Sequence, residues 1–245
     1  MTALPPIVGR STWIADRQSL LAREKAHTRE GDAIAAARRR LPMTEVDASA
    51  TVVGENGAVP FLDVFDGRDQ LVVYKHMWHT GAGIEGQCEG CTASIFDLHD
   101  ASYLHHRGVS FAVFSAGPWT EIPPFREFMG YSLPWYSMVG VDDRGVGAGL
   151  IDEPGLLACY LRVGDRVYLT NETIGRGVET MMAQAHLLDL TVYGRQEQWE
   201  DSPPGWPQHR TGSWWSRDGR PVPQWTRPGA APLGESGGPS EHCCG

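Results

Sequence analysis

Two cysteines separated by two residues, Cys88 and Cys91, are the residues of this sequence best suited to chemistry. Their spacing lets both sulfurs join in one disulfide or bind one metal ion. A dense β-prone run, residues 71–74, and a glycine-rich loop precede them, and a helix is expected to begin at the motif. Backbone N–H groups at a helix N-terminus stabilise a thiolate and lower its pKa. The motif therefore predicts a reactive dithiol.

Two histidines upstream of the motif, His76 and His79, offer a second interpretation of the same sulfurs. With Cys88 and Cys91 they form a His2Cys2 set that could hold copper, zinc or iron, and the mixture of ligands does not choose among these metals. On a regular strand, side chains three positions apart face opposite sides, so one shared ion requires the backbone to leave the strand near residue 78. The alternative is one histidine packed in the strand and one solvated in the loop. A metal-dependent redox enzyme and a metal carrier therefore remain beside the dithiol hypothesis, and no cofactor is certain.

The other three cysteines call for separate explanations. Five cysteines in 245 residues do not suit the disulfide framework of a small secreted domain. Cys159 lies in an apolar run and is expected to be a core thiol. Cys243 and Cys244 end a segment rich in Gly, Pro and Ser, so they are candidate accessory thiols on a flexible tether.

The composition restricts the classes of partner. A net charge of −9 argues against nucleic acid, because phosphate binding needs concentrated Lys and Arg. The sequence contains no apolar stretch of 18 residues and shows no signal peptide, so no membrane span is predicted and the cytoplasm is the expected compartment. A small molecule or a thiol is the expected substrate.

Four segments are expected along the chain. They are a helical arm (1–43), an α/β domain (44–200), a Trp/Pro-rich extension packed on that domain (201–227) and a flexible tail (228–245). Ser11 is the expected N-cap of the arm, Gly31 is expected to break it into two helices, and the arm is a candidate homodimer element. The extension holds four tryptophans, which a disordered segment would hardly retain.

Within the α/β domain, apolar strand-like runs alternate with helix-like stretches. Residues 109–115 form a second strongly apolar strand, and residues 156–163 and 166–169 form an expected hairpin. The helix that starts at the motif is expected to reach residue 103, and another helix is expected over residues 177–190. This order predicts a central mixed sheet flanked by helices.

The motif region resembles the thioredoxin and peroxiredoxin superfamily. Residues 65–74 look like the segment that enters the central strand of that superfamily, and residues 89–92 are similar to the peroxiredoxin turn that holds the attacking cysteine. Pro134 looks like the proline that is cis in thioredoxins and faces the sulfurs. The thioredoxin resemblance implies attack by Cys88, whereas the peroxiredoxin resemblance implies attack by Cys91. Cys88 is favoured because it is expected to be the more exposed.

Over residues 13–206 the chain resembles the thioredoxin-like domain-of-unknown-function family 899. The resemblance rests on residues 38–42, 88–92, 128–130, 134–135, 176–179, 187–191 and 194–195. It implies a thioredoxin-like fold more than a reaction, because fold does not dictate function. The first hypothesis is therefore a thiol-dependent oxidoreductase that acts through the Cys88–Cys91 dithiol, with Pro134 beside it.

Overall fold

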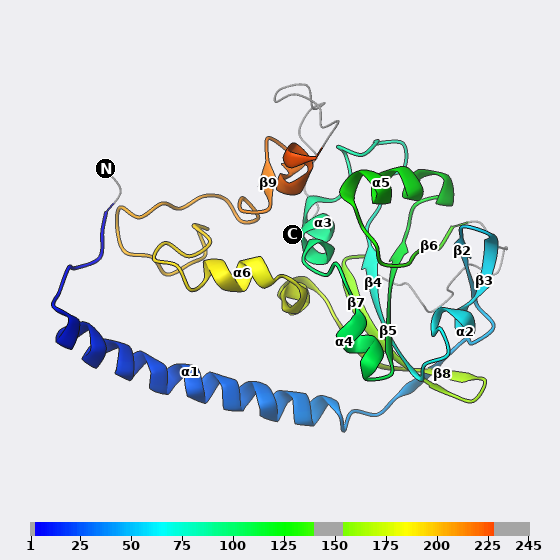
Figure 1. Cartoon of the computed structure of the whole chain (residues 1–245), viewed down its shortest axis with the longest axis horizontal. Coiled ribbons are helices and arrows are strands. Elements are labelled where there is room, and N and C mark those ends of the chain that lie inside the picture. The colour runs from blue at the N-terminus through cyan, green and yellow to red at the C-terminus, as the bar shows by residue number, and fades with distance from the viewer. Residues whose placement is uncertain (1–2, 140–153, 228–245) are drawn as a thin grey trace.

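A mixed sheet forms the centre of the computed structural model, which describes residues 3–139 and 154–227. Within these residues eight strands are ordered β1-β8-β7-β4-β5-β6-β2-β3 (Figure 1). The strands are β1 (Thr44–Val46), β2 (Thr51–Gly54), β3 (Gly57–Pro60), β4 (Gln70–His76), β5 (Val109–Ser115), β6 (Trp135–Ser137), β7 (Leu156–Val163) and β8 (Arg166–Thr173). The central strand β4 runs parallel to β5 and antiparallel to β7. The expected central mixed sheet is confirmed.

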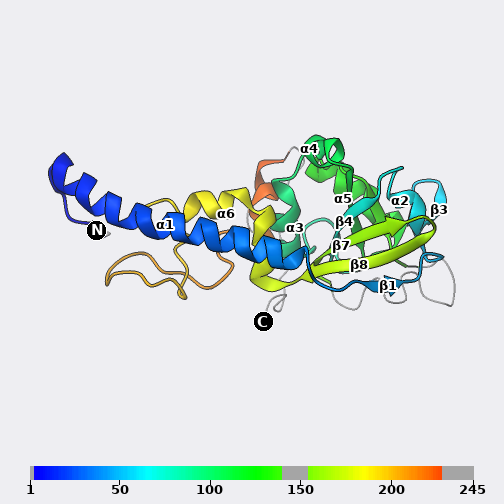
Figure 2. The ribbon, with the colours of Figure 1, turned by 90° about the horizontal axis from the view of Figure 1, so that it is seen from below.

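Helices flank this sheet, and one long helix extends along the outside of the molecule (Figures 1 and 2). The α-helices are α1 (Arg10–Arg38), α2 (Phe61–Val64), α3 (Glu89–Phe96), α4 (Ser102–His106), α5 (Ile122–Met129) and α6 (Ala183–Leu188). The 3-10 helices are η1 (Trp119–Glu121), η2 (Gly175–Met181) and η3 (Val222–Thr226). No helix in the described ranges is both long and apolar enough to cross a membrane.

The two faces of the sheet bury separate apolar clusters. Alternate residues of a strand point to opposite faces, so Val73 joins one cluster and Tyr74 joins the other. The cluster around Tyr74 also contains Cys88 and Cys91 from α3 and the rings of α5 and β6. The strand expected to be covered on both faces is therefore β4, and it carries the chain directly to the cysteines.

Several helix boundaries differ from those expected. The arm is one continuous helix through Gly31, since a single glycine costs only about 1 kcal/mol in a helix interior and alanines surround it here. Gly9, not Ser11, is the N-cap, and no side chain caps the helix. The helix after the motif ends at Phe96, and α4 starts anew at Ser102. The expected helix over 177–190 is 3-10 up to Met181 and α-helical only from Ala183.

The C-terminal extension is irregular chain with one short hairpin, formed by β9 (Ser216–Arg217) and β10 (Arg220–Pro221). Two of its rings, Trp214 and Trp215, pack against the cluster that contains the motif cysteines. Cys243 and Cys244 lie outside the described residues.

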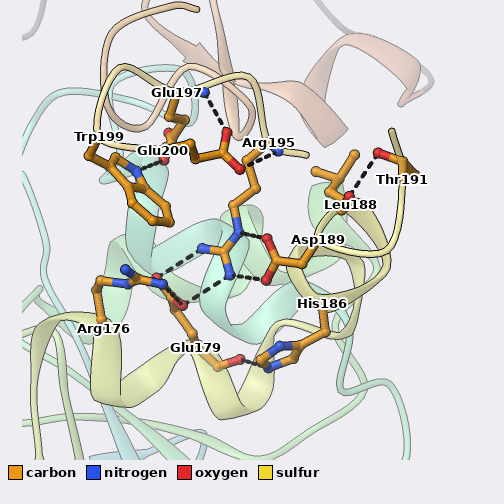
Figure 3. Close-up of polar contacts among 10 residues, drawn as sticks. All are labelled: Arg176, Glu179, His186, Leu188, Asp189, Thr191, Arg195, Glu197, Trp199 and Glu200. Atoms are coloured by element: carbon orange, nitrogen blue, oxygen red, sulfur yellow. Dashed lines mark hydrogen bonds and ion pairs between the residues drawn. The ribbon is translucent and has the colours of Figure 1, made fainter. Parts of the chain in front are cut away.

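An ion cluster holds together the chain that leads into this extension (Figure 3). Arg195, 2% exposed, donates to both oxygens of Asp189 at 2.8 Å and lies 3.0 Å from Glu179 of η2. Arg176 pairs with the same Glu179 at 3.0 Å and covers the ring of Trp199. The cluster joins η2, the end of α6 and the chain that follows.

Candidate active site: the buried dithiol at the start of α3

The first turn of α3 holds both cysteines. Cys88 is the N-cap residue, and its sulfur accepts a hydrogen bond from the Cys91 backbone N–H at 3.4 Å. Neither cysteine forms a disulfide in the structure. The N–H groups of a helix start favour a thiolate, and the reactive dithiol stays a prediction.

Both cysteine residues are buried to a similar degree. Cys88 is 2% exposed and Cys91 is 4% exposed. The expectation that Cys88 would be the more exposed cysteine is therefore wrong, because the loop before α3 and the C-terminal extension pack around the helix start. The exposure of the two residues therefore does not indicate which sulfur attacks.

Hydrogen-bond donors instead converge on Cys91. The backbone N–H of Met77 donates to its sulfur at 3.4 Å. The Tyr74 hydroxyl, on a ring that is 1% exposed, also bonds to this sulfur. Burial raises the pKa of Tyr74 well above its usual value, and a negative charge on Cys91, and more weakly on Cys88, raises it further. Tyr74 therefore keeps its proton and remains a donor to a Cys91 thiolate.

Replacing Tyr74 with Phe is expected to reduce the thiolate population of Cys91. A hydrogen bond to a charged group contributes about 1.5–3 kcal/mol, so the pH of half-maximal alkylation of Cys91 should rise by roughly one unit or more. Iodoacetamide labelling across a pH series, read by mass spectrometry of the Cys91 peptide, measures this. Tyr160→Phe, a matched change in the cluster on the other sheet face, should leave the curve in place. Equal curves for wild type and Tyr74→Phe would contradict the assigned role.

The loop that precedes the motif is fixed by a buried glutamine. Gln87, 3% exposed, accepts from the His79 backbone N–H at 3.0 Å and donates to the carbonyl oxygens of His79 and Gly83. Trp78 is anchored by Glu121, which accepts its indole N–H at 2.8 Å. Gly117 lies against the Trp78 ring, where a Cβ would come within 2.3 Å of ring atoms, so a side chain there would displace the ring. These contacts hold the backbone turn between β4 and α3.

A cavity of about 350 Å³ opens beside this loop. Its walls include Trp78, Ile84, Gln87, Glu121 and Phe125. The lining is mostly apolar, and the carboxylate of Glu121 is already bonded to Trp78 and to the backbone N–H of Gly81. Gln87, the residue directly before Cys88, lines the cavity, so the cavity lies close to the dithiol along the chain.

The structure does not assemble the proposed His2Cys2 set. His76 is fully buried among the rings of Trp78, Phe125 and Trp135. His79 directs Nδ1 to the Gly86 carbonyl oxygen at 2.8 Å. Among residues 3–139 and 154–227 no three His, Cys, Asp or Glu side chains are grouped to hold a metal. His76 is thus the packed strand histidine that the alternative interpretation described.

The buried imidazole of His76 should make stability fall in mild acid. Burial lowers its pKa from 6.5 to about 3. Between these values the unfolded chain is protonated at His76 and the folded protein is not, so unfolding becomes easier as the pH falls from 6.5 towards 3. The free energy of unfolding falls by about 1.4 kcal/mol per pH unit, or by roughly 2 kcal/mol between pH 6.5 and pH 5.

Urea unfolding of wild type and His76→Phe at pH 7 and pH 5 checks this expectation. The variant should lose less stability than wild type over this interval, whereas His106→Phe, at an exposed histidine, should behave as wild type. Equal losses in wild type and His76→Phe would refute the assignment.

Pro134 does not lie where its resemblance implied. It is exposed, its strand β6 is separated from β4 by β5, and no peptide bond of the described chain is cis. The antiparallel neighbour of β4 is β7, and Pro154 comes just before it. The N–H of Gly155 donates to the Lys75 carbonyl oxygen at 2.7 Å, so the chain at Pro154 lies beside the end of β4. Sequence pattern alone did not distinguish these two prolines, since each precedes a strand.

The C-terminal extension contributes a buried arginine next to the loop. Arg220, 0% exposed, donates to Gln224 at 2.9 Å and lies 3.5 Å from Glu85. Gln224 in turn donates to the Ile84 carbonyl oxygen at 2.9 Å. No local pattern could predict this contact, because the partners are more than 130 positions apart. Tyr74 was also missed as a site residue, although a single tyrosine in an aliphatic strand was a visible clue.

Comparison with known protein families gives one match that covers most of the chain. The family described as "Bacterial protein of unknown function (DUF899)" matches residues 2–220. The chain belongs to this family. The expected membership is confirmed. The matched residues end at Arg220, within the C-terminal extension. Comparison with curated proteins found no match.

Solved structures overlap part of the chain. Xanthomonas campestris peroxiredoxin Q aligns with a TM-score of 0.40 and 12% identity, covering 58% of this chain and 94% of the other. Peroxidoxin BcpB from Mycobacterium tuberculosis gives 0.39 and 17%, covering 58% and 96%. A secreted M. tuberculosis disulfide oxidoreductase homologous to E. coli DsbE gives 0.35 and 14%, covering 57% and 97%. At these values no residue role is transferred to this chain.

Proposed function

We propose that the protein is a thiol-dependent oxidoreductase in which Cys91 attacks and Cys88 resolves. The observation that carries the proposal is the convergence of donors on Cys91, from the Met77 N–H and the Tyr74 hydroxyl, with the thiol of Cys88 one helical turn away. The donors stabilise the thiolate that must attack, and the second thiol supplies the resolving group.

The chemistry balances with either of two oxidants. With a disulfide, Cys91 attacks one sulfur, the S–S bond breaks and the leaving thiolate takes a proton; Cys88 then attacks the mixed disulfide and releases the second thiol. With a hydroperoxide, Cys91 attacks the terminal oxygen, the O–O bond breaks and an alcohol or water leaves; Cys88 condenses with the sulfenic acid and releases water. Each route ends in a Cys88–Cys91 disulfide, and two electrons pass to the substrate.

The burial of both sulfurs supports a small substrate. A large protein disulfide cannot reach cysteines that are 2% and 4% exposed without movement of the loop or the extension. The cavity beside Gln87 has an apolar lining that suits a small organic molecule. Cytoplasmic location and a small-molecule or thiol substrate remain predictions of this proposal.

The test is to oxidise the reduced full chain separately with hydrogen peroxide, cumene hydroperoxide and oxidised glutathione. The expected product is a chain 2 Da lighter whose Cys88 and Cys91 peptides are linked, and dithiothreitol should restore both thiols. The oxidant that reacts fastest identifies the substrate class. If all three leave Cys88 and Cys91 reduced while they oxidise other cysteines of the chain, the proposal is wrong.

A further inference from the structure

The N-terminal helix α1 stands apart from the body of the molecule. It has 29 residues, a length of about 44 Å, yet none of them is buried by the part of the chain that the structure describes. Figures 1 and 2 show it extending along one side, away from the sheet. Its ends are fixed, because Ala3 bonds to Gly205 and Tyr193 before the helix begins, and β1 joins the sheet soon after it ends. The helix is thus held in place, but none of residues 3–139 and 154–227 buries its apolar side chains.

Apolar residues recur on one side of this helix at intervals of seven. Trp13 and Leu20 are each 46% exposed, and Ile14 is 43% exposed; Leu21 follows Ile14 by seven. Residues seven apart lie on nearly the same face of an α-helix, so these four form a stripe. A helix of this length gains most of its stability from packing an apolar face, which α1 does not do within the described chain.

Charges are arranged about the same stripe. Arg17 and Glu24 lie along its middle and form an ion pair at 2.8 Å. Asp16 and Lys25 flank it. Arg17 and Glu24 are equally far from the midpoint between Leu20 and Leu21, and so are Asp16 and Lys25. The two residues of each pair carry opposite charges.

We propose that α1 pairs in antiparallel orientation with α1 of a second copy of this chain. A two-fold axis between Leu20 and Leu21 sets the leucines of the two copies against each other. It also places each Arg17 opposite Glu24 of the other copy and each Asp16 opposite Lys25. A parallel pair in register would instead place like charges together, which costs stability. The charge pattern thus selects the partner and its direction.

The test is the mass of the full chain in solution by light scattering. Wild type should have twice the chain mass of 26.9 kDa. Leu20→Glu with Leu21→Glu should be a monomer, with its helix content unchanged by circular dichroism because Glu is a good helix former. A monomeric wild type would overturn the proposal, and so would a dimer that this double substitution leaves intact.

Charge variants test the direction of the pair. Arg17→Glu and Glu24→Arg should each weaken self-association by at least about tenfold, and an equimolar mixture should recover it. Arg29→Glu, the same charge change outside the stripe and its flanking charges, should have little effect. An Arg17→Glu chain that associates as well as wild type would exclude the antiparallel register. The proposal would also be refuted if wild type were a monomer that dimerises only after removal of residues 228–245. That result would mean that residues 228–245 cover the apolar stripe of α1 within the same chain.

Discussion

Cys91→Ser is expected to abolish turnover of the oxidant that reacts fastest with wild type, by on the order of 10³-fold or more, because the attacking sulfur is lost. Cys88→Ser should retain the first chemical step but not the second. With a disulfide substrate this variant should accumulate a mixed disulfide at Cys91, and with a hydroperoxide a sulfenic acid. Stopped-flow consumption of one equivalent of oxidant, followed by mass spectrometry, distinguishes the two variants.

The pair of variants also decides which sulfur attacks. If Cys88→Ser is inert and Cys91→Ser forms the trapped intermediate, the roles are reversed, as the thioredoxin resemblance implied. Cys159→Ser is the control, because this thiol lies on β7 and outside the cluster that holds the dithiol. Burial raises the pKa of Cys159, so it should react slowly and contribute little at neutral pH.

Local sequence pattern was enough to predict the centre of the fold. The apolar residues of β4 and the cysteine spacing after it fix a buried strand that leads into a helix start, since strand period and helix capping are local effects. The same locality explains the errors in helix length. Gly31 is a weak helix former in isolation, yet it lies inside α1, where neighbouring alanines favour the helix.

The sequence could not predict which side chains meet at the site, because they are brought together by contacts between distant parts of the chain. His76 and His79 are close in sequence, but one is packed among aromatic rings and the other bonds the loop backbone, so proximity along the chain did not make them a ligand pair. Arg220 reaches the loop from the far end of the chain. Such placements follow from tertiary packing, on which residue spacing carries no information.

Removal of the charge at Arg195 is expected to cause the largest loss of stability among the substitutions considered. Arg195→Met leaves Glu179, whose side chain is 14% exposed, without its buried partner (Figure 3). Breaking a buried ion pair costs about 3–5 kcal/mol, and the lower end applies here because Asp189 is 39% exposed and can recover hydration. Urea unfolding should therefore show a loss of about 3 kcal/mol. Arg176→Met, which removes a 64% exposed partner of the same Glu179, should cost less than about 1 kcal/mol.

The pH dependence separates this explanation from a simple loss of packing. Burial alone would raise the pKa of Glu179, but hydrogen bonds and charge from Arg195 and Arg176 outweigh it and lower that pKa below 4.5. A carboxylate with a lowered pKa adds stability above its unfolded pKa and loses it as the pH falls. The difference between wild type and Arg195→Met should therefore shrink below about pH 4.5. A Glu179→Gln substitution should recover part of the loss in the Arg195→Met background, because it removes the unpaired charge. A difference that is independent of pH, with no recovery, would mean that Arg195 acts through its packed side chain and not through its charge.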